Sequence, residues 1–171
     1  MKNGTTELAN KKTKEINYFY EHCKVVELLI NSLGPKFNPA TKHHIRGAIR
    51  EASYAVHSNI NNQFIKGKNK GKALWKSKNL KHGEKSIVEH VVPVSIIIEK
   101  VMECYAKHKK ISVAEIENVI KEWSFLALIS MDDDKKLRYS RLTKTMPEDW
   151  DGKNKFARYE EAGIELEEFT K

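Results

Sequence analysis

Residues 86–93, with the sequence SIVEHVVP, place an acid and a histidine, Glu89 and His90, inside an otherwise apolar stretch. Short β-branched runs favour strands, so residues 87–92 are predicted to form one. Neighbouring side chains of a strand point to opposite faces, and one of the two ionisable groups must therefore face inward. A buried ionisable group loses hydration free energy unless it has a partner. The segment is either an ordinary half-buried strand or a site of chemistry or metal binding.

The order of residues 89–93, an acid, a histidine, two aliphatic residues and a proline, resembles the signature that opens the HNH, or His-Me finger, nuclease motif. In that family the acid binds a divalent metal and the histidine activates the water that attacks a phosphodiester. The resemblance implies that Glu89 is a metal ligand and His90 the general base. Carboxylate ligands suit Mg²⁺ or Mn²⁺, although transition metals also bind such sites.

The rest of the resemblance lies in residues 125–141. Residues 125–129 are apolar and predict a second strand, and a helix over residues 131–141 then begins with consecutive aspartates. The family has a strand, a returning strand and a crossing helix that carries the last metal ligand, which implies that Asp134 or Asp133 completes the site. The alternative is that these aspartates are ordinary residues of a first helical turn.

The sequence also departs from the family. Two predicted helices, residues 94–107 and 112–123, stand where the family has a short loop, and an aspartate replaces the last histidine or asparagine of the motif. Many HNH proteins carry paired zinc-binding cysteines, whereas this chain has only Cys23 and Cys104, far apart in the sequence.

The helical periodicity of the N-terminal region predicts amphipathic helices over residues 7–33 and 39–60. The predicted fold class is α+β and mostly helical, a short β-hairpin with a crossing helix among several α-helices. We expect one compact domain built from an N-terminal helical region (residues 1–62), a basic mobile loop (63–85) and an HNH-like core with a helical insertion and a C-terminal tail (86–171). Trp75 of the loop either anchors it to the core or stacks on a base.

The chain has 31 basic and 23 acidic residues, a net charge of +8, which favours a polyanionic partner. The second predicted helix carries Lys42, His43, Arg46 and Arg50 at helical spacings, a candidate phosphate-facing stripe or simply a solvated face. Nucleic-acid contacts, with DNA favoured over RNA, are predicted at Lys66, Lys68, Lys70, Lys72, Lys76, Lys78, Arg46, Arg138 and Arg158.

The sequence shows no apolar run long enough to cross a membrane, and its first residues are polar, so a cytoplasmic location without membrane partners is expected. The long first helix is the candidate surface for a homodimer. The predicted function is a metal-dependent endonuclease. One alternative is a non-catalytic nucleic-acid-binding or phage or defence accessory protein, and a second is a helical protein-interaction module.

Overall fold

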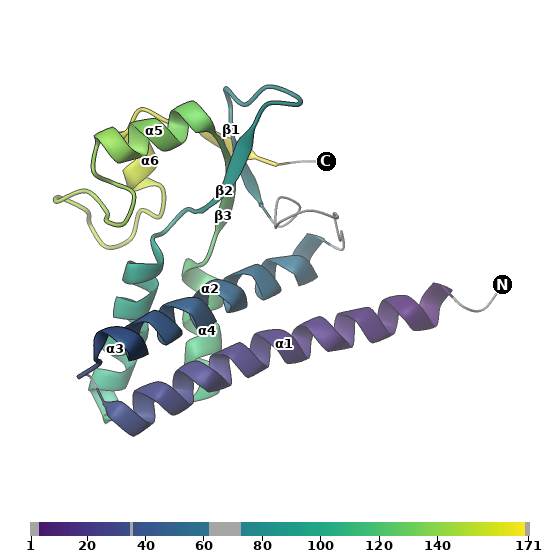
Figure 1. Ribbon diagram of the computed structural model, residues 1–171, viewed down its shortest axis with the longest axis vertical. Helices are drawn as coiled ribbons and strands as arrows, with labels where there is room; N and C mark the ends of the chain where they lie inside the picture. Colours follow the sequence, from purple (N-terminus) through teal and green to yellow (C-terminus); the bar gives the residue numbers. More distant parts are fainter. Residues whose placement is uncertain (1–3, 35, 62–72, 170–171) are drawn as a thin grey trace.

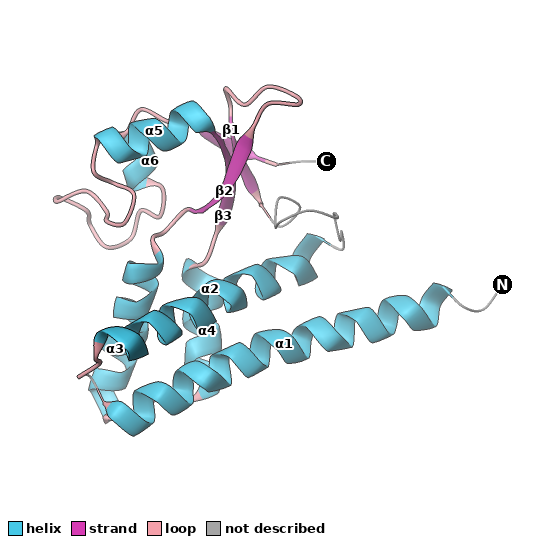
Figure 2. Ribbon diagram, viewed as in Figure 1, coloured by secondary structure: helices cyan, strands magenta, loops and turns pink. Residues whose placement is uncertain are grey.

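The structure, a computed structural model, describes residues 4–34, 36–61 and 73–169, with side chains from residue 18 onward except in residues 57–61. Within these residues the fold is α+β and mostly helical, as predicted (Figure 2). Four helices form one part of the molecule. A four-stranded sheet and two shorter helices form the other, and the chain passes from the sheet to the helical part before α3 and returns to the sheet after α4 (Figure 1).

The helical part begins with α1 (Gly4–Leu33) and α2 (Pro39–Asn61), which pack against each other. The buried side of α1 repeats every three or four residues, at Phe19, Cys23, Val26 and Ile30. Gly34 ends α1 in the left-handed region, with φ 64°, and its N–H donates to the Ile30 carbonyl at 2.9 Å.

Two further helices, α3 (Val94–His108) and α4 (Val113–Trp123), are the predicted insertion. Ser112 and Glu115 form the predicted capping box at the start of α4. The buried isoleucines of α3 and α4 join the core of α1 and α2, and burying each such side chain contributes about 1.5–3 kcal/mol. Among the described residues, none of the helices combines the length and the apolar composition of a membrane-spanning segment.

The sheet has the strand order β2-β3-β1-β4. Strands β2 (Ser86–His90) and β3 (Leu126–Ser130) are antiparallel, with Glu89 opposite Ala127 and His90 opposite Leu126. Helix α5 (Met131–Tyr139) follows β3 directly and packs against both strands. The strand, returning strand and helix therefore occur in the predicted order, with the helical insertion between the strands.

The predicted basic loop, residues 63–85, differs from the structure. Residues 62–72 lie outside the described residues, but Trp75–Ser77 form β1, parallel to β3, and the tail adds β4 (Leu166–Glu168) beside it. Trp75 anchors this strand because its ring packs edge-on against Phe156 of the segment before α6 (Ala157–Glu161), with centroids 4.8 Å apart. Three-residue strands depend on their neighbours in the sheet, and their own sequences carry little signal.

Candidate functional site: a cavity at the end of strand β2

A small cavity, about 110 Å³ in volume, opens where β2 ends beside α2. Both residues of the predicted pair, Glu89 and His90, line it. The other lining residues come from α2, from the start of α3 and from the loop after α5: Arg46, Arg50, Pro93, Val94, Ser95, Thr143 and Lys144. Segments from three parts of the sequence, residues 46–50, 89–95 and 143–144, thus meet around one acid, one histidine and three cations.

His90 faces the helical part of the molecule. Only 4% of its surface is exposed, and its ring lies against the ring of Tyr54 on α2, with centroids 5.5 Å apart. Of the two residues, His90 is therefore the one that faces inward toward the helices, as the alternation of a strand requires.

Glu89 contacts a different element. Its Oε1 accepts a hydrogen bond from Nη2 of Arg158, on α6, at 3.1 Å. Burial raises the pKa of Glu89 above its ordinary value, and the nearby charge of Asp134 acts in the same direction, while Arg158 and Arg50 act against both. The negative charge of the Glu89 carboxylate would be neutralised by a divalent cation, either free or bound to a phosphate, or by a proton.

Arg158 is the centre of a hydrogen-bond network behind the site. Its side chain is completely buried, and it donates to the main-chain carbonyls of residues 90, 91, 142 and 143 as well as to Glu89. These bonds fix the end of β2 and the loop that carries Lys144 relative to each other. A guanidinium enclosed in this way does not reach an external phosphate, so we assign Arg158 to positioning the site instead of the predicted nucleic-acid contact.

The predicted third metal ligand does not join the cavity. Asp133 accepts hydrogen bonds from Lys136 and Ser130, and although burial acts to raise its pKa, these bonds outweigh burial and lower it. Asp134 pairs with Arg138 one turn further along α5. Both aspartates thus serve the first turn of α5, the alternative that the sequence left open.

Among the described residues, no group of three or more histidine, cysteine or acidic side chains is placed to hold a metal ion. Glu89 and His90 with Asp133 or Asp134 therefore do not fit the predicted three-ligand centre. A requirement for Mg²⁺ or Mn²⁺ stays a prediction from the resemblance alone.

The remaining predicted contacts fall in different places. Lys66, Lys68, Lys70 and Lys72 lie outside the described residues. Lys76 and Lys78 are paired across the sheet edge with Glu167 at 3.0 Å and Glu165 at 2.6 Å. Arg138 is exposed and is held by Asp134, whereas Arg46 is exposed and lines the cavity.

Sequence reasoning missed Lys144 and its neighbours Thr143 and Ser95. Ser95 donates from its hydroxyl to the Lys144 carbonyl at 2.7 Å, which ties the loop to the first turn of α3. Neither segment carries a motif, and the loop is held at the cavity both by this bond and by Arg158, which donates to the carbonyls of residues 142 and 143.

The chain matches no protein-family model, and comparison with curated proteins and with solved structures likewise gave no significant match. The resemblance to HNH nucleases therefore rests on residues 89–93 and on the order of β2, β3 and α5.

Proposed function

We propose that this chain is an endonuclease that hydrolyses phosphodiester bonds in nucleic acid, with DNA favoured, and that His90 is its general base. The observation that carries the proposal is the cavity in which the Glu89–His90 pair meets Arg46, Arg50 and Lys144. Hydrolysis needs a group that takes a proton from water and cations that stabilise the charge growing on the phosphate, and this cavity offers both.

His90 suits the role of base by its residue type, and it lines the cavity although only 4% of its surface is exposed. Histidine ordinarily titrates near pH 6.5, so its neutral ring accepts a proton at neutral pH, as lysine does not without a large shift in pKa. Packing against Tyr54 and the buried end of β2 limits the motion of the ring. A base held in one orientation loses little entropy when the substrate arrives.

The three cations meet the second requirement, stabilisation of the charge that grows on the phosphate. Arg46 and Arg50 of α2 and Lys144 of the loop after α5 all line the cavity, so a phosphate bound there would lie among positive charges. Among the described residues that line this cavity, Glu89 is the only one with a carboxylate. Mg²⁺ is commonly held by one or two carboxylates together with substrate phosphates, so Glu89 is the residue at which a metal would bind. The proposed roles of His90 and of the three cations do not depend on that metal.

The test is a cleavage assay on plasmid DNA and on RNA, with Mg²⁺, with Mn²⁺ and with a chelator. We expect wild-type cleavage, its loss in His90→Ala and its reduction in Glu89→Gln, a change that keeps an oxygen for Arg158. His108→Ala is the matched control, because His108 is exposed at the opposite end of α3. Full cleavage by His90→Ala would contradict the mechanism. Equal cleavage by the wild type with chelator and with metal would show that no metal is required.

A second candidate, a nucleic-acid-binding protein without catalytic activity, is favoured by the exposed basic residues of α2. Lys42, His43, Arg46 and Arg50 are all on the surface. This candidate predicts salt-sensitive binding that needs no metal and survives His90→Ala, with no cleavage under any condition.

A further inference from the structure

Helix α2 carries a row of exposed basic residues, which we call the α2 track: Lys42, His43, Arg46 and Arg50. All four side chains are exposed, while Ile45, Ile49 and Ala52 on the other side of the helix are fully buried. Lys42, Arg46 and Arg50 follow one another at four-residue spacing and therefore share one side of the helix. Each step of four residues advances about 6 Å, a distance comparable with that between neighbouring phosphates on one strand.

One end of the α2 track is the cavity. Arg46 and Arg50 line the cavity together with His90, whereas Lys42 lies one to two turns earlier on the helix. Helix α2 lies between the sheet part and α1 (Figure 1), and the cavity places Arg46 and Arg50 against residues of the sheet part.

The α2 track forms no salt bridge among the described residues, although the charge of Arg50 acts on Glu89. In the described part of the chain, neither these side chains nor Lys144 form an ion pair, whereas Lys76 and Lys78 at the sheet edge are both paired with glutamates. The carboxylate of the cavity, Glu89, is itself paired with Arg158. The surface leading into the cavity is therefore cationic, and binding a polyanion there releases counterions without breaking an existing pair.

We infer that the α2 track binds the sugar-phosphate backbone of a nucleic-acid strand and leads it into the cavity, where Arg50 and Lys144 flank the phosphate that is cut. The identity of the cut phosphate rests on the proposed function, whereas the binding along α2 does not. Contacts to phosphates carry no sequence information, so binding through the track is independent of sequence.

Gly47 allows a test with one added charge. It is exposed on α2, and a Cβ atom built there meets nothing within 4 Å, so larger side chains fit. A residue at this position has His43, His44, Arg50 and Glu51 as its neighbours on the helix surface. Gly47→Glu places a carboxylate on the track, and Gly47→Gln is its uncharged control of equal size.

Binding is measured by fluorescence anisotropy with a fluorescein-labelled DNA duplex and a single strand of the same length, over a range of salt, in the His90→Ala background to prevent cleavage. We expect Gly47→Glu to weaken binding several-fold relative to Gly47→Gln, with the difference shrinking as salt screens the charges. Equal affinity of the two variants would overturn the inference.

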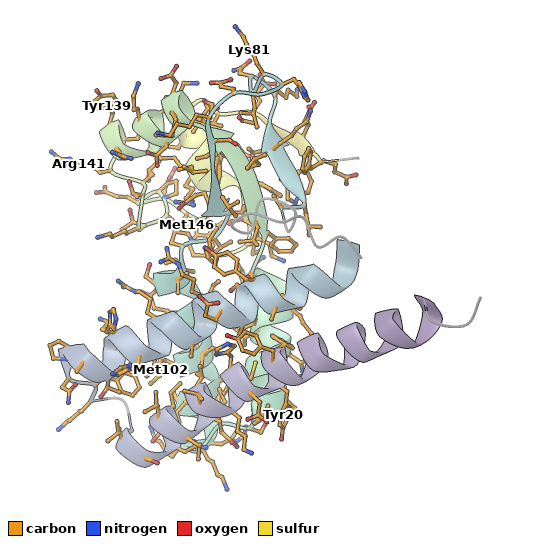
Figure 3. The ribbon with its side chains drawn as sticks, turned by 45° about the vertical axis from the view of Figure 1, so that its right-hand side comes forward. Tyr20, Lys81, Met102, Tyr139, Arg141 and Met146 are labelled. Carbon is orange, nitrogen blue, oxygen red and sulfur yellow. The ribbon has the colours of Figure 1, made fainter. Side chains whose placement is uncertain are left out.

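The salt dependence gives a second readout. In a triple variant, Lys42→Gln with Arg46→Gln and Arg50→Gln, the slope of log affinity against log salt should fall by about 2–3 for duplex DNA, close to one per lost phosphate contact. The control removes three exposed lysines elsewhere, Lys81, Lys107 and Lys110, the first of which lies at the sheet end of the molecule, away from the helices (Figure 3). A triple variant with the slope of this control would overturn the inference.

Failure of the inference is distinguishable from failure of the proposed function. A wild-type chain that binds through the α2 track but cleaves no nucleic acid supports the track and rejects the nuclease. Cleavage that persists while the triple variant binds like its control supports the nuclease and rejects the track.

Discussion

Replacement of Arg158 by methionine should be among the most destabilising single changes in this protein. The side chain is fully buried and donates to four main-chain carbonyls and to Glu89. Methionine fills similar space but donates nothing, so it leaves the half-buried carboxylate of Glu89 without its ion-pair partner. Breaking a buried pair by removing one partner costs about 3–5 kcal/mol, which is a large share of the roughly 5–15 kcal/mol that stabilises a typical domain.

The loss of stability should depend on pH. Burial raises the pKa of Glu89 in the folded chain, and Arg158 partly offsets this rise, so the pKa climbs further in Arg158→Met. A carboxyl group with a raised folded-state pKa contributes stability that is fully present below its unfolded pKa and is lost as the pH rises through the folded value. Arg158→Met should therefore lose less stability near pH 4, where Glu89 is largely protonated, than near pH 8.

The assay is urea denaturation followed by circular dichroism at the two pH values. Adding Glu89→Gln to Arg158→Met should recover part of the loss at the higher pH, because the buried charge is gone. Arg138→Met is the control, since Arg138 also pairs with an aspartate but is exposed, and it should lose less. A loss below about 1 kcal/mol for Arg158→Met, or an equal loss at both pH values, would refute the account.

Three smaller predictions concern stability and are measured by the same denaturation. Gly47→Ala should stabilise the chain by about 0.5–1 kcal/mol, because a helix-interior glycine with open space gains helix propensity. Ser112→Ala removes the cap of α4 and should cost about 1 kcal/mol. Asn31→Ala removes two hydrogen bonds to the main chain of Ile111, at 2.8 and 2.9 Å, and should cost about 1–3 kcal/mol. For each variant, an unchanged urea midpoint would contradict the prediction.

Much of the fold could be predicted because its signals are local. The end of α1 at Gly34, the Ser112 capping box and the β-branched run of β2 depend on residues next to one another in the sequence. The pairing of β2 with β3 across two helices followed from the apolar run before residue 130 and from the family pattern. The strands β1 and β4 were missed because their stability comes from pairing with each other and with β3.

The site was harder to predict because its partners are distant in the sequence. Arg158 looked like a surface cation, yet it binds carbonyls and a carboxylate 15 to 69 residues away, which no local pattern reveals. Asp133 and Asp134 matched two patterns at once, a metal ligand and a first helical turn, and the structure satisfies the second. The sequence around Lys144 contains no motif that would have marked it as a site residue.

The most direct test of the central claim is the rate of nucleic-acid cleavage by His90→Ala under single-turnover conditions, with enzyme in excess so that weaker binding does not lower the observed rate. General base catalysis contributes about 10²–10⁴-fold, so we expect the variant to be slower than wild type by at least about 100-fold, with unchanged affinity for the oligonucleotide. A variant that cleaves at the wild-type rate would show that His90 is not the base and that this cavity is not the active site.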